Sequence, residues 1–356
     1  MTTTAGAFAS TLIETSQRAW VNNCAWRMGD TRPALGGAPT AGGAHGWHGH
    51  FENLLLHLSA ALRFDAPELF VQQCVWLRVS FESHGLDPTL LSASIEALRD
   101  ELHDKLPSGV RDLVVTVVAD GLREARLPQS AQGIGLAGND SHTALAREYL
   151  LAALEGRRDD AIALVMNALE RGASVEQITR DVLGRVQREL GSMWHRSQLS
   201  IVEEHLVSRN TEAVLTSIRS RLPRAASNGL KVLITSVDGD LHDIGLRVVA
   251  DHFEMAGWTP IYLGPSTPPT EAALAAAEFE VQLVAVGAKL VTHLAAAAEL
   301  VTQLRADERT RSTPVIFGGR PFDLAPNLWR ALKADGAASS AVDAVALAKR
   351  LVAAQR

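Results

Sequence analysis

The sequence predicts a multidomain protein in which two helical regions precede an α/β domain with a parallel sheet. Two observations predict this order. Up to about residue 221 apolar residues recur at the spacing of a helix face, whereas after residue 230 short β-rich runs alternate with helical stretches. Stretches rich in Pro, Gly and Ser lie at 129–141 and 223–229, so the domains are expected to span 1–130, 140–223 and 229–356.

The N-terminal domain is predicted to be entirely helical. Phe51, Leu54 and Leu58 recur at helical spacing, and Pro88 follows Asp87 as the first residue of a helix. The expected helices are 8–26, 51–62, 67–84, 88–102 and 108–123. Residues 1–140 hold 10 basic and 15 acidic side chains, a net charge of −5. An acidic domain lacks the phosphate-neutralising surface on which DNA affinity depends, so direct DNA binding is not expected.

The middle region is predicted to be a bundle of about four helices. From Thr143 to Arg221 the apolar residues keep helical periodicity, as at Tyr149, Leu150 and Leu154. Gly172 and Gly191 are plausible breaks between helices. After this bundle, strands are expected at 232–237, 259–263, 281–288, 314–317 and 336–340. Their alternation with helical stretches predicts a parallel sheet with helices on both faces.

An imidazole and a carboxylate follow the first of these strands. In the run Asp238-Gly-Asp240-Leu-His242-Asp-Ile-Gly245, His242 stands on a loop at the carboxyl end of the strand, two residues after Asp240. Ligands of open parallel sheets bind at that edge. The run therefore indicates a ligand site at the loop after the first strand.

This Asp-x-His-x-x-Gly pattern resembles the signature of cobalamin-binding domains, which have a flavodoxin-like (Rossmann-type) fold. The resemblance implies that His242 is the lower axial ligand of cobalt, with the nucleotide tail of the cofactor buried beside the sheet. A metal-bound imidazole usually donates its other ring proton to a carboxylate, and Asp240 is placed to accept it. Gly245 would begin the next helix without a side chain to block the tail. Leu241 and Ile244, within the same run, are expected to contact the cofactor.

Two later loops carry further elements of the cobalamin pattern. The fourth strand ends at Gly318-Gly319, where the absence of side chains lets a bulky ligand approach the backbone. After the third strand the pattern usually has a Ser that hydrogen-bonds the buried base of the tail. This chain has Gly287 there, followed by Leu290 in the same loop. The departure removes one expected contact and leaves the pocket in place.

The middle region carries a second motif, in which nine residues separate Trp194 from Glu204-His205. It resembles the cap of adenosylcobalamin-dependent photoreceptors. The resemblance implies that Trp194 and Glu204, with His205, enclose the adenosyl group on the upper face of the corrin. It also implies that His195 can ligate cobalt once light has broken the cobalt-carbon bond. Together the two motifs extend the resemblance over residues 140 to 356.

A helical, acidic domain ahead of such a module resembles the photocobilins, in which a globin-like domain holds biliverdin close to the corrin. This resemblance is one of architecture. Candidate bilin contacts are the aromatic and imidazole groups of one stretch, His45, Trp47, His48 and His50. Arg27, Arg32 or Arg63 could pair with the two propionates. A surface loop or a weak metal site is the alternative interpretation of the same stretch.

The resemblance implies a light sensor that binds adenosylcobalamin, and also biliverdin, and whose output is self-association as a dimer or tetramer or contact with an unknown downstream protein. The alternative is a corrinoid carrier for methyl transfer, which shares the sheet domain and a helical cap. No P-loop, nucleophile elbow or zinc-ligand spacing is present, so an enzyme is not expected. A mutase would need a barrel domain that this sequence lacks. Two cysteines, no signal peptide and no apolar span indicate a cytoplasmic protein without a membrane segment.

Overall fold

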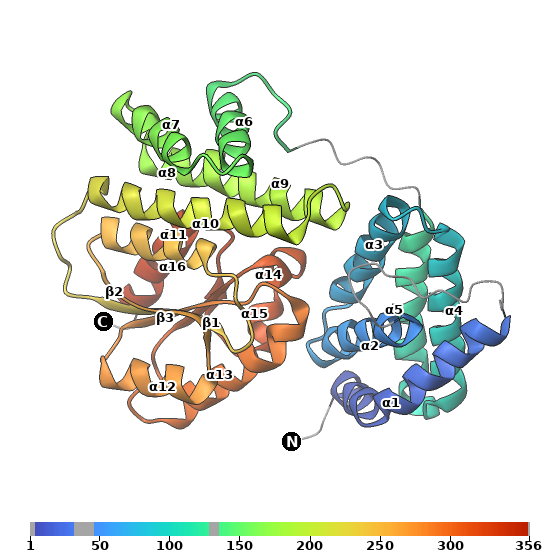
Figure 1. The fold of residues 1–356 in the computed structure, drawn as a ribbon. Coiled ribbons are helices and arrows are strands. Elements are labelled where there is room, and N and C mark those ends of the chain that lie inside the picture. The colour runs from blue at the N-terminus through green and yellow to red at the C-terminus, as the bar shows by residue number, and fades with distance from the viewer. Residues whose placement is uncertain (1–3, 32–45, 128–134, 355–356) are drawn as a thin grey trace. The chain divides into compact units, whose positions relative to one another are not determined.

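A computed structural model describes residues 4–31, 46–127 and 135–354 of the chain (Figure 1). The chain divides into two compact units. One contains residues 1–130 together with 288–298 and 319–333, and the other contains 131–287 with 299–318 and 334–356. Each unit is described by itself.

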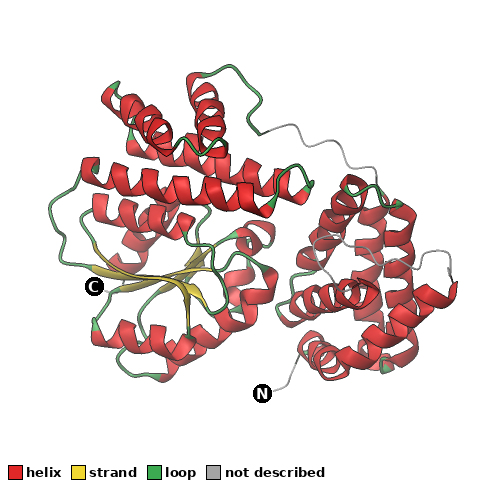
Figure 2. Cartoon of the chain, in the orientation of Figure 1, coloured by secondary structure: helices red, strands yellow, loops and turns green. Residues whose placement is uncertain are grey.

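The N-terminal domain is all-helical in its described residues, as predicted (Figure 2). Its helices are α1 (Ala5–Thr31), α2 (Gly46–Arg63), α3 (Glu68–Ser83), α4 (Pro88–Lys105) and α5 (Ser108–Arg126). The side chain of Asp87 accepts a hydrogen bond from the Thr89 amide and caps α4, with Pro88 in its first turn. The apolar face predicted from Phe51, Leu54 and Leu58 is fully buried. Whether this helical domain is globin-like remains a prediction.

The cap consists of α6 (Ser141–Leu154), α7 (Arg158–Glu170), α8 (Val175–Gln177), α9 (Gly184–His195) and α10 (Ile201–Ile218), which ends in the single turn η3 (Arg219–Arg221). A π-helical turn, η2 (Ile178–Leu183), joins α8 to α9, so these three segments form one continuous helix of the bundle. Tyr149 is buried in its core and its hydroxyl lies 2.8 Å from that of Thr211. Gly172 ends α7 with a positive φ of 98°, as predicted.

The expected break at Gly191 is wrong, because Gly191 lies inside α9. A glycine within a helix costs only about 1 kcal/mol relative to alanine. The neighbouring Val186 and Leu190 are buried in the cap core, and their packing outweighs that cost. The glycine that has a structural role is Gly184, where the π-helical turn ends: a Cβ there would lie 2.9 Å from the carbonyl oxygen of Thr179.

The α/β domain is built on a parallel sheet with the order β2-β1-β3-β4-β5, which is the flavodoxin-like order. The strands are β1 (Lys231–Val237), β2 (Thr259–Thr267), β3 (Leu283–Gly287), β4 (Val315–Gly318) and β5 (Gly336–Ala337). The longer helices are α11 (Ile244–Met255), α12 (Pro269–Glu278), α13 (Leu294–Ala306) and α16 (Ala341–Ala353), and the short ones are η4 (Val291–His293), α14 (Arg320–Leu324) and α15 (Leu328–Ala331). Figure 1 shows α11 and α16 on one face of the sheet and α12 and α13 on the other. The predicted doubly wound sheet is thereby confirmed.

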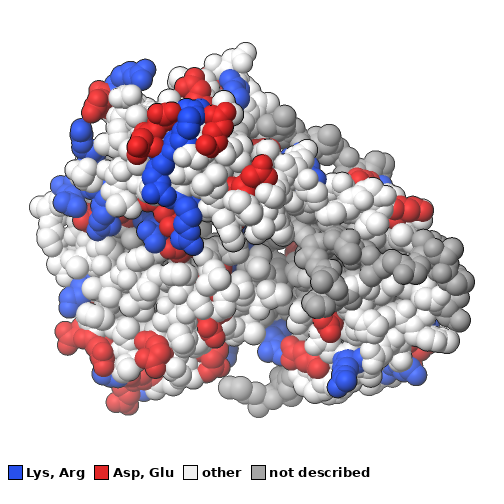
Figure 3. All heavy atoms as spheres, viewed as in Figure 1, with Lys and Arg blue, Asp and Glu red and all other residues white. Residues whose placement is uncertain are grey.

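The cap packs on the α/β domain through α10 and α11. Arg219, just after α10, pairs with Asp251 at 2.9 Å and with Glu254 at 2.5 Å, both on α11. Arg224 pairs with the same Glu254 at 2.8 Å. On the face shown in Figure 3, basic and acidic side chains lie next to each other over the cap. No helix in the described part of the chain has the length and apolar character needed to cross a membrane.

The buried carboxyl of Asp251 makes the stability of this junction depend on pH. Burial raises the pKa of Asp251 to about 6. The attraction of Arg219 lowers this pKa, but its effect is smaller than that of burial. Because the unfolded value is about 4, this contribution to stability is complete below pH ~4 and is lost as the pH rises through about 6. Asp251→Asn is therefore expected to raise the free energy of unfolding at pH 7 by about 1–2 kcal/mol. Hydrogen exchange of the α11 amides in variant and wild type, at matched pH values between 4 and 7, measures this. An equal difference at every pH would contradict it.

Candidate corrinoid-binding site

The predicted pair of Asp240 and His242 forms at the carboxyl end of β1. One carboxylate oxygen of Asp240, Oδ1, accepts hydrogen bonds from His242 Nδ1 at 2.7 Å and from the His242 amide at 3.1 Å. The side chain of Asp240 is 1% exposed, whereas that of His242 is 56% exposed. This bond directs the Nδ1 proton toward Asp240 and leaves Nε2 as the nitrogen that can bind a metal ion. The loop thus presents an oriented, accessible imidazole.

The residue after His242 holds the start of α11. Asp243 Oδ2 accepts hydrogen bonds from the Tyr262 hydroxyl at 3.1 Å and from Arg247 Nε at 2.9 Å. Burial and the neighbouring Asp243 carboxylate raise the pKa of Tyr262, so its hydroxyl keeps the proton that it donates. Ile244 packs against the cap core, and a Cβ at Gly245 would meet no heavy atom within 4 Å. The first turn of α11 is therefore fixed on one side and open at Gly245, as predicted.

Two other strands, β3 and β4, end in glycine at this edge of the sheet. Gly287 and Gly318 are register partners on β3 and β4, and Ser236 of β1 pairs with Gly287 on its other side. Gly319 has a φ of 126°, and a Cβ there would lie 2.1 Å from the Ala288 carbonyl oxygen, so only glycine fits. These glycines thus allow neighbouring segments to pack closely at this edge of the sheet.

Gly287 is closely covered by Leu246 of α11. A Cβ at Gly287 would lie 3.0 Å from Leu246 Cδ2 and 3.2 Å from Cδ1. A serine there would require this side chain to move. Of the three apolar residues predicted to touch the cofactor, Leu241 and Leu290 are exposed and Ile244 is half-buried. Next to His242 in the chain, Leu241 therefore presents an apolar side chain to solvent.

The cap motif lies at the turn between α9 and α10. Trp194 is 40% exposed near the end of α9, and Glu204 lies in the first turn of α10. Glu203 and Ser200 cap α10 by mutual hydrogen bonds, so Glu204 is not needed for capping. Glu204 instead accepts a 2.7 Å bond from Ser208, and the exposed His205 lies 3.6 Å from it.

Large apolar side chains beside this motif are exposed. They are Ile201, Val202 and Leu206. A cluster of exposed apolar groups on a folded domain usually marks a binding surface. His195, next to Trp194, is half-buried. Its role as a cobalt ligand after light remains a prediction.

The stretch proposed for biliverdin is helical from Gly46 onward, and His45 lies outside the described residues. His50 is buried against the rings of Phe51 and Phe81, and its Nε2 lies 2.8 Å from the Ser94 hydroxyl. Burial lowers the pKa of His50 to about 4, so its ring is neutral. His50 is thus a core residue.

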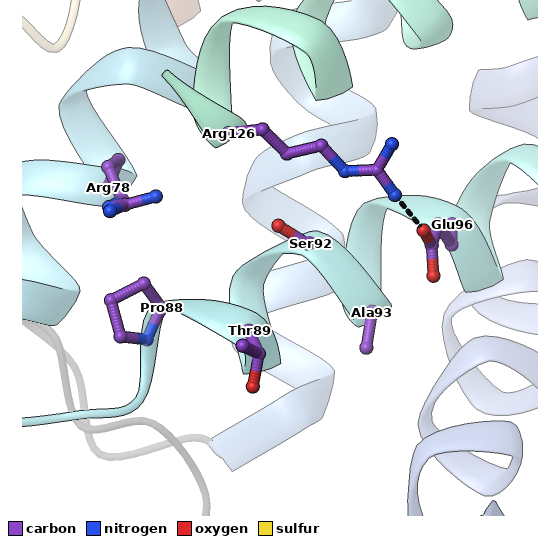
Figure 4. A pocket seen from close by; sticks show the side chains of 7 residues that line it. All are labelled: Arg78, Pro88, Thr89, Ser92, Ala93, Glu96 and Arg126. Atoms are coloured by element: carbon purple, nitrogen blue, oxygen red, sulfur yellow. Dashed lines mark hydrogen bonds and ion pairs between the residues drawn. The ribbon is translucent and has the colours of Figure 1, made fainter. Parts of the chain in front are cut away.

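Because His50 is part of the core, Trp47 and His48 remain the candidate biliverdin contacts in the described part of this stretch. Trp47 is half-buried with its ring 5.6 Å from that of His50, and His48 is exposed. Figure 4 shows a hollow elsewhere on this domain, formed by α3, α4 and α5. Its arginines are already paired: Arg126 with Glu96, and Arg78 with Glu82 and the Ala125 carbonyl. Biliverdin binding remains a prediction.

Comparison with known proteins finds two segments that match B12-binding domains. Residues 230–346 match a family model described as a B12 binding domain, and residues 145–219 match a second model of the same description. A corrinoid protein of Desulfitobacterium hafniense is 25% identical over 216 residues, which cover 58% of this chain and 97% of that protein. Dimethylamine corrinoid protein 1 of Methanosarcina acetivorans is 24% identical over 216 residues, covering 59% and 100%.

The fold of these segments also occurs in a solved structure. The monomethylamine corrinoid protein of Methanosarcina barkeri superposes with a TM-score of 0.52 at 18% identity, covering 60% of this chain and 100% of that one. Both matched models lie C-terminal to the helices α1 to α5. Residues 145–219 and 230–346 are therefore B12-binding domains, and the chain is a corrinoid-binding protein.

Proposed function

We propose that this protein holds cobalamin under the α9–α10 cap, with His242 as the lower ligand of cobalt, and carries it as a corrinoid protein of methyl transfer. The observation that supports the ligand assignment is the buried Asp240 carboxylate 2.7 Å from Nδ1 of an imidazole that is otherwise exposed. Leu241, next to His242 in the chain, adds an exposed apolar side chain that would suit the face of a corrin.

Each part of the chain has a task in this proposal. His242 would hold cobalt through Nε2, and Asp240 would orient the ring and increase its basicity. The cap would exclude water from the upper face of the corrin. The bound corrinoid would supply a cobalt ion that accepts and donates a methyl group. The relatives named for methylamines support this use, since a methylated amine is a source of methyl groups. The chain itself would be a carrier and not an enzyme.

A second candidate, light sensing with adenosylcobalamin, is favoured by the cap. Trp194 and Glu204 stand at the spacing of the photoreceptor motif, and the Trp194 side chain is exposed. In this version Trp194 and Glu204 would hold the adenosyl group, and His195 would be available to hold cobalt in its place. The output would be a change in self-association or in contact with another protein, and biliverdin in the N-terminal domain would be a second chromophore. A ligand change has such an effect only if it favours one of two packings.

One experiment separates the two candidates. The protein is purified in the dark from cells supplied with adenosylcobalamin, methylcobalamin and biliverdin, and its absorption spectrum is recorded before and after green and then red light. Methylcobalamin bound without preference, together with an unchanged oligomeric state after light, supports carriage. Preferential binding of adenosylcobalamin and a light-dependent change in sedimentation support sensing. A far-red absorption band would indicate bound biliverdin. A spectrum without corrinoid bands would overturn both candidate functions.

A further inference from the structure

The loop that carries His242 is held in place by a residue of the neighbouring edge strand. Between the end of β1 and the start of α11, Asp238, Gly239, Leu241 and His242 are exposed, whereas Asp240 is buried. An exposed loop of this length has little packing of its own to fix its shape. The buried position of Asp240, on which the orientation of His242 depends, must therefore be fixed by contacts from outside the loop.

Ser266, near the end of β2, makes these contacts. Its amide donates to the Asp240 carbonyl at 3.0 Å and to the Ser236 hydroxyl at 2.8 Å. Its hydroxyl accepts a 3.0 Å bond from the Gly239 amide and donates a 3.3 Å bond to the Asp238 carboxylate. One residue thus contacts three successive residues of the loop.

Ser236 completes the arrangement from β1. Its hydroxyl donates a 2.5 Å bond to the same Asp240 carbonyl and is fully buried. Both hydroxyls therefore have defined partners, and together they fix the backbone on either side of Gly239. With the backbone fixed in this way, the Asp240 side chain lies where its Oδ1 can accept a hydrogen bond from His242 Nδ1.

The backbone of β2 is deformed to bring Ser266 to the loop. The β1–β2 register shifts between Thr235, paired with Gly264, and Val237, paired with Thr267. This irregularity adds a residue to β2, and such bulges redirect groups near functional sites. Ser266 itself has a φ of 52°. This left-handed conformation is unfavourable for residues other than Gly, Asn and Asp. A serine at a position where glycine fits better indicates that its hydroxyl is needed.

We propose that Ser266 is a positioning residue for the cobalt site: it holds the Asp238–Asp240 turn so that Asp240 orients His242 toward the metal. This inference rests on the proposed ligation of cobalt by His242. The cobalamin pattern recognised in the sequence has no residue on β2. In this proposal β2 supports the loop that carries His242.

The test uses Ser266→Gly in the full-length protein. Glycine tolerates the positive φ, so the fold is expected to be at least as stable as the wild type while the hydroxyl is lost. The matched control is Thr267→Val, which removes the next hydroxyl of the same strand. That hydroxyl lies 2.7 Å from Thr235 Oγ1. Each variant is labelled with 15N-histidine and loaded with cob(II)alamin.

The main readout is the electron paramagnetic resonance spectrum, in which an axial 15N nitrogen splits the cobalt lines into doublets. We expect Ser266→Gly to lose part of the doublet signal and to bind cobalamin about 10-fold more weakly, the lower end of the range for partners behind a metal ligand. Its Gly239 amide should exchange faster in the apoprotein. Thr267→Val should match the wild type in all three measurements.

The outcomes separate the two proposals. If the wild type shows the doublet and Ser266→Gly shows it undiminished at unchanged affinity, the positioning role is wrong and His242 ligation stands. If the wild type has no doublet, His242 is not the ligand and both proposals fail. Ser266→Asn restores a side-chain oxygen in a residue that tolerates positive φ. Partial recovery of the doublet in that variant supports the hydroxyl contact as the cause.

Discussion

Replacing His242 by alanine is expected to remove the axial nitrogen from cobalt and to weaken cobalamin binding by at least about 100-fold. Loss of a partner behind a metal ligand already costs roughly 10–100-fold in affinity, and here the ligand itself is removed. The effect is large because the Asp240 carboxylate, 1% exposed, also loses the imidazole that donates to it. Absorption titration of the apoprotein gives the affinity, and the 15N splitting of cob(II)alamin identifies the ligand.

Two companion variants sharpen this result. Asp240→Asn retains an oxygen that can accept from Nδ1 but removes the charge that increases the basicity of the ring, so a smaller loss of about 10-fold is expected. His103→Ala is the matched control, since His103 is an exposed imidazole 3.6 Å from Asp104 on α4. It should leave affinity and spectrum unchanged. If His242→Ala binds with the wild-type spectrum, another residue ligates cobalt.

The parts of the fold that the sequence predicts are those set by local pattern. The α/β alternation predicts the sheet because buried parallel strands are short apolar runs, as in β1, where Val232 to Val237 are buried throughout. The break expected at Gly191 is wrong because packing of the helix face outweighs the propensity of one residue. Helix bounds also shift where tertiary contacts extend them, as in α2, which begins at Gly46 instead of Phe51.

The candidate site divides in the same way. The pair of Asp240 and His242 is predictable because residues two apart on a tight loop can share a hydrogen bond. The contacts of Ser266 are not, because they depend on a register shift between two strands and on a residue 26 positions from Asp240. Nor could the pattern indicate that Leu246 covers Gly287, since this depends on how α11 lies on the sheet. His50 lies four residues before Leu54 on the buried face of α2, so its burial follows once the helix extends back to Gly46.

Replacing Trp194 by alanine is expected to leave cobalamin bound and to remove any preference for the adenosyl form. An indole that is 40% exposed in the free protein can be buried against an upper ligand, and truncating such an aromatic contact costs about 2–4 kcal/mol, or roughly 30- to 1000-fold in affinity. The variant should thus bind adenosylcobalamin and methylcobalamin with similar affinities. Trp26→Ala is the matched control, because Trp26 is 68% exposed on α1, in the other unit.

The preference of the wild type then decides what the cap is for. A carrier must exchange its upper ligand with other molecules, so its cap cannot hold one ligand much more tightly than another. A sensor must retain the adenosyl group in the dark, and for that it needs differential affinity. If the wild type prefers adenosylcobalamin and Trp194→Ala abolishes the preference, the cap discriminates between upper ligands. This result would support light sensing. If the wild type shows no preference, Trp194 serves to shield the corrin, and methyl carriage is the function that the cap permits.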